Sequence, residues 1–381
     1  MTLSHSPAPC WDIFCAVVDN FGDVGVCWRL ARQLAAEHGI AVRLWIDDLK
    51  SACRLVPSVL PGLDVQQVEG VEIRQWTAPF PDVEPGAVVI AAFACSLPDD
   101  FVEAMARRDP KPVWINLEYL SAEDWVAGCH RLPSPHPRLP LRQHFFFPGL
   151  DRQTGGLLRE ADYDARRMLF SPAAFWKALD LPLPRPDELR VSLFCYETPA
   201  LGELLELWRQ GPMPVTCLVP EGRALPCVAP IFGLTDLRAG DRLVRDALTV
   251  QILPFVAQPR YDELLWACDL NFVRGEDSFV RAQWAAHPFV WHIYVQDEDA
   301  HLEKLDAFLA RYRPGLEPAA AEAVTAFWQA WNRGQGAAAA WSAFRQALPA
   351  LAAHGEAWSA GLREAGELAQ NLVQFFKDEI E

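Results

Sequence analysis

Short apolar runs, separated by polar segments with helical spacing, recur along the chain and predict two sets of buried strands. In the first half, runs rich in β-branched and aromatic residues lie at 13–18, 42–46, 87–93, 112–117 and 144–147. A second set lies at 189–196, 215–219, 249–255, 270–273 and 289–295. Apolar strands that alternate with helices are typical of parallel sheets covered on both faces. The sequence therefore predicts an α/β protein with two doubly wound parallel sheets.

A proline-rich segment, Leu181-Pro182-Leu183-Pro184-Arg185-Pro186, separates the two sets. Its prolines lack N–H donors and stiffen the backbone, as a linker requires. We therefore expect a first domain over 1–180 and a second over 187–353. From about residue 317 the pattern becomes helical and alanine-rich, and the apolar spacing within 354–381 predicts one amphipathic helix over 356–380.

Composition and charge narrow the classes of function. The chain has 34 Lys and Arg against 50 Asp and Glu, a net charge of −16. This charge disfavours nonspecific binding to nucleic acid or anionic membranes and favours a basic protein partner. The ten cysteines form no C-x-x-C pair, which indicates free thiols in a reducing cytoplasm. We also expect no signal peptide and no membrane span.

One turn predicts a carboxylate site. Asp19-Asn20-Phe21-Gly22-Asp23-Val24-Gly25 follows the apolar run at 13–18 and precedes an amphipathic segment at 26–37. Helix starts in dinucleotide-binding folds offer glycines and free N–H groups to a pyrophosphate, which two carboxylates would repel. The same carboxylates suit a cation, and the helix dipole favours an ionised aspartate. We therefore predict a catalytic turn with a positively charged substrate.

A second turn has the opposite character. Arg274-Gly275-Glu276-Asp277-Ser278 follows the apolar run at 270–273 and precedes a helical pattern at 279–286. Arginine donors, a hydroxyl and free helix N–H groups can together hold a diphosphate. An isolated turn of this kind is equally consistent with an Asp/Ser N-cap beside an incidental arginine. Its place at the carboxyl end of a strand favours the ligand site.

Aromatic side chains follow other strands predicted in the second half. Phe194, Tyr196 and Phe255 could enclose a base, and Gln258 could read its edge or contact phosphate. Each aromatic residue, taken alone, more often belongs to a core.

Metal-dependent chemistry is not expected, and neither is a cofactor. Two Asp-x-Asp tripeptides, Asp162-Tyr163-Asp164 and Asp297-Glu298-Asp299, lie in charged stretches typical of solvated surface. The histidines lack zinc-site spacing. His292, within an apolar run, is predicted to be buried with its hydrogen bonds satisfied.

Five blocks in order carry a resemblance to a known family: Asp19 to Ala31, Asn116 to Glu123, Thr154 to Leu157, Arg274 to Ser278 and Trp291 to Tyr294. They resemble the EarP family of protein-arginine rhamnosyltransferases, and the similarity covers nearly the whole chain. The family implies a GT-B glycosyltransferase with two Rossmann-like domains facing a cleft. It also implies that the acceptor side lies in 1–180, that the nucleotide sugar binds within 187–353, and that the C-terminal helix crosses back onto the first domain.

The resemblance implies an inverting transfer of L-rhamnose from dTDP-β-L-rhamnose to an arginine of translation elongation factor P, which relieves ribosome stalling at polyproline. It places the general base at Asp23, with Asp19 beside it, and a third essential acid at Glu276. It further implies that substrates are bound by Asn20, Phe21, Gly22, Phe194, Tyr196, Phe255, Gln258, Arg274, Asp277 and Ser278. One departure is the block Ala91-Ala92-Phe93-Ala94-Cys95, which lacks a glutamate expected before Phe93 and receives no role.

The implied chemistry agrees with the two turns. A guanidinium has a pKa above about 12, so its full deprotonation in water is too costly. Carboxylates can instead grip the cation, orient one nitrogen and accept its proton as the new bond forms. Two other classes of function stay open: a nucleotide-sugar or dinucleotide enzyme without glycosyl transfer, and a non-catalytic protein that only docks the factor. The missing G-x-G-x-x-G pattern disfavours the dinucleotide, and the retained acids disfavour the docking protein.

Overall fold

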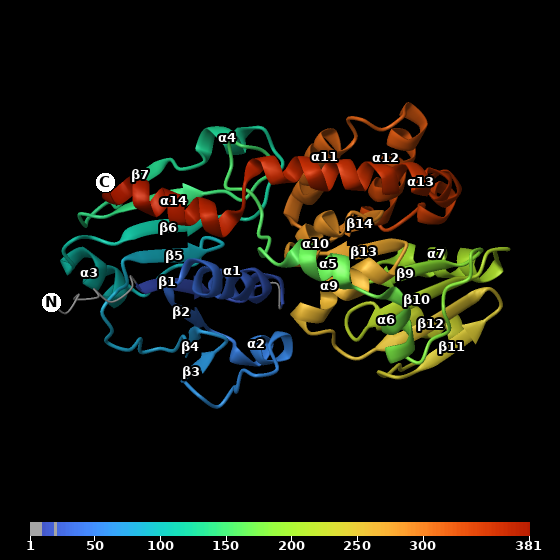
Figure 1. Cartoon of the computed structure of the whole chain (residues 1–381), viewed down its shortest axis with the longest axis horizontal. Coiled ribbons are helices and arrows are strands. Elements are labelled where there is room, and N and C mark those ends of the chain that lie inside the picture. The colour runs from blue at the N-terminus through green and yellow to red at the C-terminus, as the bar shows by residue number, and fades with distance from the viewer. Residues whose placement is uncertain (1–9, 19–20) are drawn as a thin grey trace. The chain divides into compact units, whose positions relative to one another are not determined.

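The chain divides into two compact units in a computed structural model that describes residues 10–18 and 21–381 (Figure 1). Unit 1 contains the described residues up to Ala161 together with Leu362–Glu381, and unit 2 is Asp162–Gly361. This division falls earlier than the domain boundary expected at residue 180. Tyr163 is buried in unit 2, where its hydroxyl accepts a hydrogen bond from Trp266 Nε1 at 2.9 Å. The proline-rich segment therefore lies inside unit 2.

The sheet of unit 1 has the order β3-β4-β2-β1-β5-β6-β8-β7. Its strands are β1 Cys10–Cys15, β2 Ala41–Ile46, β3 Val65–Val68, β4 Val71–Gln75, β5 Val88–Ala92, β6 Val113–Leu117, β7 Pro133–Pro135 and β8 Arg142–Phe146. The neighbouring strands β4, β2, β1, β5, β6 and β8 pair in parallel, and β3 and β7 pair antiparallel at the two edges. The helices of this unit are α1 Gly22–His38, α2 Leu49–Leu55, α3 Asp99–Arg107, α4 Trp125–Cys129 and α14 Leu368–Ile380, with a 3-10 turn η3 at Arg363–Ala365.

The sheet of unit 2 has the order β11-β12-β10-β9-β13-β14. Its strands are β9 Leu189–Leu193, β10 Val215–Pro220, β11 Arg242–Arg245, β12 Leu248–Leu253, β13 Leu270–Arg274 and β14 Phe289–His292, all parallel except β11. The helices are α5 Tyr163–Leu169, α6 Pro172–Ala178, α7 Pro199–Gln210, α8 Leu225–Val228, α9 Gln258–Ala267, α10 Asp277–Ala285, α11 Ala300–Tyr312, α12 Pro318–Asn332 and α13 Ala337–Leu362. Short 3-10 turns lie at η1 Ala229–Phe232 and η2 Asp297–Asp299.

Each predicted strand is present, as β1, β2, β5, β6 and β8 in unit 1 and as β9, β10, β12, β13 and β14 in unit 2. The pattern missed β3, β4, β7 and β11. Three of these are antiparallel edge strands, which bury little and so carry no long apolar run; β7 also contains two prolines.

The C-terminal segment returns to unit 1, but the prediction of one continuous helix over 356–380 is wrong. The helical path breaks between α13 and α14 at Gly366, whose φ is 83°. A Cβ on Gly156 would lie 2.4 Å from the carbonyl oxygen of Gly366, so the two backbones meet at closest approach. Leu368 N donates to Leu157 O at 3.2 Å, and the Glu367 side chain caps α14 by accepting from Ala369 N and Gln370 N. In Figure 1, α14 lies beside the strands of unit 1.

Both sheets contain a point at which the strand order reverses. In unit 1, β2, β4 and β3 lie on one side of β1, and the next strand in the sequence, β5, lies on its other side. In unit 2, β10, β12 and β11 lie on one side of β9, and β13 lies on its other side. Ligands of open α/β sheets bind outside the carboxyl ends of strands at such points. The described part of the first turn, 21–25, comes after β1, and the turn at 274–278 comes after β13, so both lie at these points.

Candidate active site

The cluster at the switch point of unit 1 is organised around Asp23. This residue lies in the first turn of α1 and is only 2% exposed. Its Oδ2 accepts a hydrogen bond from Val18 N at 2.8 Å, and its Oδ1 accepts one from the Tyr119 hydroxyl at 3.1 Å. Donors directed at both oxygens, together with the helix start, favour the ionised carboxylate.

The rest of the predicted turn is only partly described. Asp19 and Asn20 lie outside the described residues. Phe21, which has no polar side-chain atom, occupies the N-cap position of α1, and the Arg54 guanidinium carbon lies 5.8 Å from its ring centre. Gly22 is the first residue of α1. Because Asp23 accepts from Val18 N, its side chain ties the start of α1 to the segment that follows β1.

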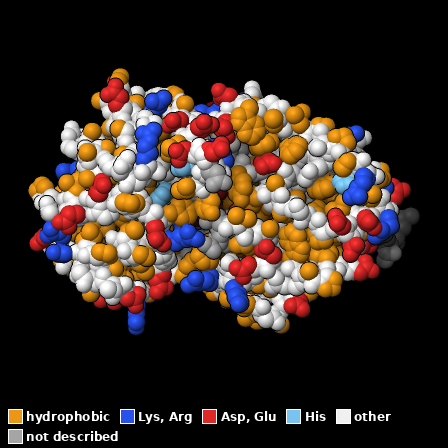
Figure 2. All heavy atoms as spheres, turned by 180° about the vertical axis from the view of Figure 1, so that it is seen from behind, with side chains coloured by type: hydrophobic (Ala, Val, Ile, Leu, Met, Phe, Trp, Pro, Cys, Tyr) orange, Lys and Arg blue, Asp and Glu red, His pale blue; other side chains and the backbone are white. Residues whose placement is uncertain are grey.

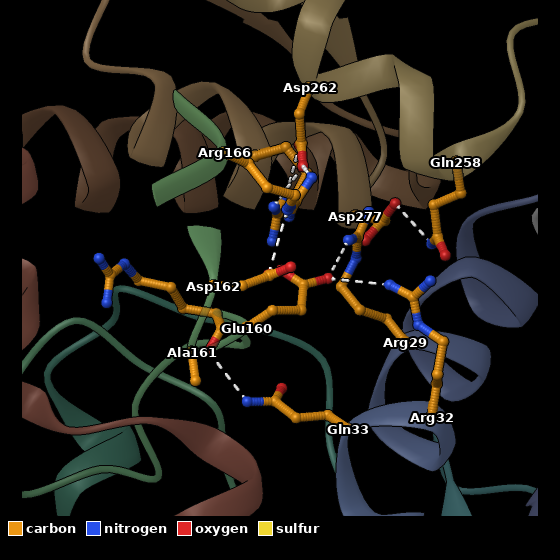
Figure 3. A network of polar contacts seen from close by, with 12 residues as sticks. Arg29, Arg32, Gln33, Glu160, Ala161, Asp162, Arg166, Gln258, Asp262 and Asp277 are labelled. Atoms are coloured by element: carbon orange, nitrogen blue, oxygen red, sulfur yellow. Dashed lines mark hydrogen bonds and ion pairs between the residues drawn. The ribbon is translucent and has the colours of Figure 1, made fainter. Parts of the chain in front are cut away.

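A buried ion pair fixes α1 to Glu160, near the end of the first segment of unit 1 (Figure 3). Arg29, which is 1% exposed, pairs with Glu160, and Arg32 Nη2 lies 3.4 Å from Glu160 Oε1. Gln33 Nε2 donates to Arg159 O at 2.9 Å. Breaking a buried pair of this kind by removing one partner costs about 3–5 kcal/mol. The helix that carries Asp23 is thus anchored through Arg29, Arg32 and Gln33 to the segment at 159–160.

The cluster at the switch point of unit 2 is organised around Arg274. Its guanidinium carbon lies 4.5 Å from the ring centre of Phe194 and 4.7 Å from that of Tyr196, within cation–π distance of both. Arg274 is 7% exposed, and its Nη1 has no hydrogen-bond partner among the described residues. A buried cation with an unused donor is suited to an anionic ligand.

The turn after Arg274 is held by its own hydrogen bonds. Ser278 Oγ donates to Arg274 O at 2.5 Å and accepts from Arg274 N at 3.0 Å, so this hydroxyl shapes the turn. Trp291 Nε1 donates to Gly275 O at 2.8 Å, and Gly275 has φ 61°. The turn before α10 is therefore rigid, and its glycine has the left-handed conformation that favours this residue.

The remaining predicted residues of unit 2 are a hydrogen-bonded pair, Gln258 and Asp277, and two separate residues, Glu276 and Phe255. Gln258, at the start of α9, donates from Nε2 to Asp277 Oδ2 at 3.1 Å (Figure 3), which joins the starts of α9 and α10. Glu276 is the half-buried N-cap residue of α10. Phe255 is half-buried in the loop between β12 and α9. The structure thus gathers Phe194, Tyr196 and Arg274 in one contact group and pairs Gln258 with Asp277.

His292 is buried as predicted, but its hydrogen bonds are not all satisfied. Burial and the nearby charge of Arg274 lower its pKa to about 3. Nδ1 has no hydrogen-bond partner in the part of the chain that the structure describes. The ring lies edge-on to Tyr196, with centroids 5.2 Å apart. The neutral imidazole therefore packs against Tyr196, one of the two rings that contact Arg274.

The Asp-x-Asp tripeptides lie at the surface only in part, because Asp164 is half-buried. Asp162, Glu298 and Asp299 are exposed, as predicted, but Tyr163 between the first pair of acids is buried. Within residues 10–18 and 21–381, no three His, Cys, Asp or Glu side chains are grouped as a metal would require.

Three further features concern the cysteines, the surface charge and the hydropathy of the helices. All ten cysteines are free thiols. Figure 2 shows basic side chains in small separate groups among acidic and apolar ones, unlike the continuous basic surface of nucleic-acid-binding proteins. No helix among the described residues is long and apolar enough to cross a membrane.

Sequence reasoning assigned no role to Tyr119 and Phe93; the structure brings Tyr119 to Asp23 and stacks Phe93 on Tyr119. Tyr119 lies 96 positions from Asp23, so no local spacing could reveal the contact. The one available signal was that Phe93 ends the apolar run at 87–93 and Tyr119 follows the run at 112–117, two runs whose carboxyl ends share an edge of the sheet.

The fold is that of GT-B glycosyltransferases. The glycosyltransferase VinC in complex with dTDP aligns with a TM-score of 0.50 at 10% identity, covering 97% of this chain and 98% of VinC. A structure solved for EarP-mediated arginine glycosylation of translation elongation factor EF-P aligns with a TM-score of 0.68 at 38% identity, covering 97% of this chain and 99% of that one.

Sequence comparison identifies the family. The model of the elongation factor P rhamnosyltransferase EarP matches residues 11–377. A protein-arginine rhamnosyltransferase of Pseudomonas putida is 52% identical over 97% of this chain and 99% of its own length, and one of Pseudomonas aeruginosa is 50% identical with the same coverage. The chain belongs to the EarP family, and it is a glycosyltransferase of the protein-arginine rhamnosyltransferase class.

Proposed function

We propose that the chain transfers L-rhamnose from dTDP-β-L-rhamnose to an arginine side chain of elongation factor P, with inversion at the anomeric carbon. The acceptor is supported by the related structure of EarP-mediated glycosylation of EF-P. The observation that carries the chemistry is the pair of charged clusters, one built on buried Asp23 and the other on buried Arg274. The reaction would take place in the cytoplasm, without metal or cofactor, and the modified factor would relieve stalling at polyproline.

On the acceptor side, Asp23 acts as the general base. Its carboxylate is held by donors from two other segments, Val18 and Tyr119, so it can grip a guanidinium in one orientation. As one guanidinium nitrogen bonds to the anomeric carbon, its N–H becomes more acidic and the proton passes to the carboxylate. Asp19, its neighbour in the turn, adds a second negative charge for the cation.

On the donor side, Arg274 stabilises the leaving group. As the bond from the anomeric carbon to the phosphate oxygen breaks, negative charge grows on dTDP, and a preorganised cation with an unused donor stabilises it. Phe194 and Tyr196 hold this cation in place. Because nitrogen attacks as the phosphate leaves, one displacement inverts the anomeric configuration. Glu276, at the start of α10, is the third acidic residue that the transfer requires.

The test is mass spectrometry of elongation factor P after incubation with this protein and dTDP-β-L-rhamnose. We expect one deoxyhexose on one arginine, unchanged yield in a chelator, and none on a factor whose acceptor arginine is replaced by lysine. Nuclear magnetic resonance of the product should show an α-linked sugar. Donor binding without any product would favour a non-catalytic nucleotide-sugar protein, and activity lost in chelator and restored by magnesium would contradict the metal-independent reaction.

A further inference from the structure

Loops at the ends of three adjacent strands meet at Asp23. β5 lies between β1 and β6, and all three are parallel, so their carboxyl ends share one edge of the sheet (Figure 1). Asp23 follows β1, Phe93 follows β5 and Tyr119 follows β6. The stacked rings of Phe93 and Tyr119 have centroids 4.3 Å apart at an interplanar angle of 17°.

The backbone that presents Phe93 is in an unfavourable conformation. Phe93 and Ala94 both have φ of 56°, in the left-handed region that residues with a Cβ rarely adopt. Phe93 N donates to Leu117 O at 2.6 Å, which ties this turn to the end of β6. Such conformations persist where the surroundings fix them and are concentrated at functional sites. Here the result is a ring placed flat against Tyr119.

Tyr119 is held by stacking although it is 39% exposed. An exposed tyrosine ordinarily samples several rotamers, which costs entropy when its hydroxyl must stay in one place. The Phe93 ring restricts that motion. The Tyr119 hydroxyl therefore stays within 3.1 Å of Asp23 Oδ1, while Val18 N holds the other carboxylate oxygen at 2.8 Å.

We infer that Tyr119 is a positioning residue for arginine glycosylation, with Phe93 as its support. The two donors hold opposite oxygens of Asp23, so the carboxylate cannot rotate without losing a hydrogen bond. A fixed carboxylate plane keeps the acceptor nitrogen and the proton-accepting oxygen in reactive geometry. This inference rests on the proposed role of Asp23 as base, and it gives a function to two segments that had none, the loops after β5 and β6.

The test compares Tyr119→Phe, which removes only the hydroxyl, with Phe93→Leu, which removes only the stacked ring. We expect Tyr119→Phe to lower kcat about tenfold, the effect of losing one charge-assisted hydrogen bond. The KM for dTDP-rhamnose and the Tm should stay close to wild type. Phe93→Leu should lower kcat by a smaller factor, since the hydroxyl remains but is less well held.

A double-mutant cycle separates positioning from a structural role. In an Asp23→Asn background, adding Tyr119→Phe should change the residual rate less than twofold, because the hydroxyl acts through the carboxylate. An equal tenfold loss in both backgrounds would overturn the inference. So would normal kcat for Tyr119→Phe beside an inactive Asp23→Asn, which would leave the proposed function intact. Near-normal turnover of Asp23→Asn itself would overturn the base assignment and this inference together.

Discussion

The switch points of the two units use one scaffold for opposite charges. In each, a parallel strand leads through a tight turn into a helix, and aromatic residues follow a neighbouring strand. Unit 1 buries a carboxylate there and holds it by hydrogen bonds from Val18 and Tyr119. Unit 2 buries a guanidinium and holds it between aromatic rings. The same strand-turn-helix arrangement thus carries a buried carboxylate in one unit and a buried guanidinium in the other, and these two side chains suit ligands of opposite charge.

The two helices are also anchored alike. A buried arginine pairs with a buried carboxylate in both units, Arg29 with Glu160 for α1 and Arg281 with Asp262 for α10. The second pair is bidentate, at 2.7 and 2.6 Å, and both side chains are fully buried. Arg166 adds a contact of 3.2 Å to Asp262 (Figure 3). In each unit the helix that follows the switch-point turn is thus anchored by a buried ion pair.

The largest expected effect tests that anchoring. Arg281→Met should destabilise unit 2 by about 3–5 kcal/mol, because it leaves Asp262 as a buried charge without its bidentate partner. Urea unfolding followed by tryptophan fluorescence measures the change. Arg260→Met on α9, which removes an exposed pair with Glu263, is the control and should cost less than about 1 kcal/mol. Equal effects of the two variants would show that the buried pair is not an anchor.

Asp23→Asn tests the acidic cluster. Turnover should fall by a factor of about a hundred or more, the usual scale for removing a general base. The fold and the affinity for dTDP should be retained, since the amide can accept from Val18 N and donate to the Tyr119 oxygen. Steady-state kinetics, calorimetry and thermal melting on the same sample distinguish the outcomes. Near-normal turnover at normal stability would show that Asp23 only ties the start of α1 to the segment that follows β1.

Arg274→Ala tests the basic cluster. Loss of a charge-assisted contact should weaken dTDP binding by about 2 kcal/mol, or roughly thirtyfold in Kd. Arg238→Ala removes an exposed arginine of the same unit and should leave Kd unchanged. Calorimetry on both variants is the measurement, and unchanged affinity for Arg274→Ala would place the diphosphate elsewhere.

The smallest effect concerns a titratable cap that belongs to unit 1. Burial raises the pKa of Glu367 to about 7. The folded state therefore keeps a proton between about pH 4.5 and 7 that the unfolded state has lost, so stability from this group falls as pH rises through that window and levels off above it. Compared with Glu367→Gln, the wild type should lose about 1–2 kcal/mol from pH 5 to pH 8, allowing for solvent screening. Urea unfolding of both proteins at the two pH values measures the difference, and parallel pH profiles would contradict it.

The sequence predicted the strands that are buried on both faces and the two turns that follow β1 and β13. It missed the antiparallel edge strands β3, β7 and β11, because short exposed strands have no distinctive apolar run. It also missed contacts between distant segments: the Tyr119 bond to Asp23, and the approach of Gly156 to Gly366 that breaks the last helix. Local pattern encodes burial and turns, whereas these contacts depend on how the completed sheet brings its loops together.

The discontinuity of unit 1 has a consequence for how the protein is made. Residues 362–381 complete this unit: Phe376 packs edge-on against Trp11 of β1, and Glu379 lies 3.5 Å from His144 of β8. Unit 2 is continuous and can fold as soon as it emerges from the ribosome, as domains generally do. The sheet that carries Asp23 must wait, with Trp11 uncovered, until synthesis has passed residue 376. An enzyme proposed to serve translation therefore completes the sheet that carries Asp23 only after residue 376 has been synthesised.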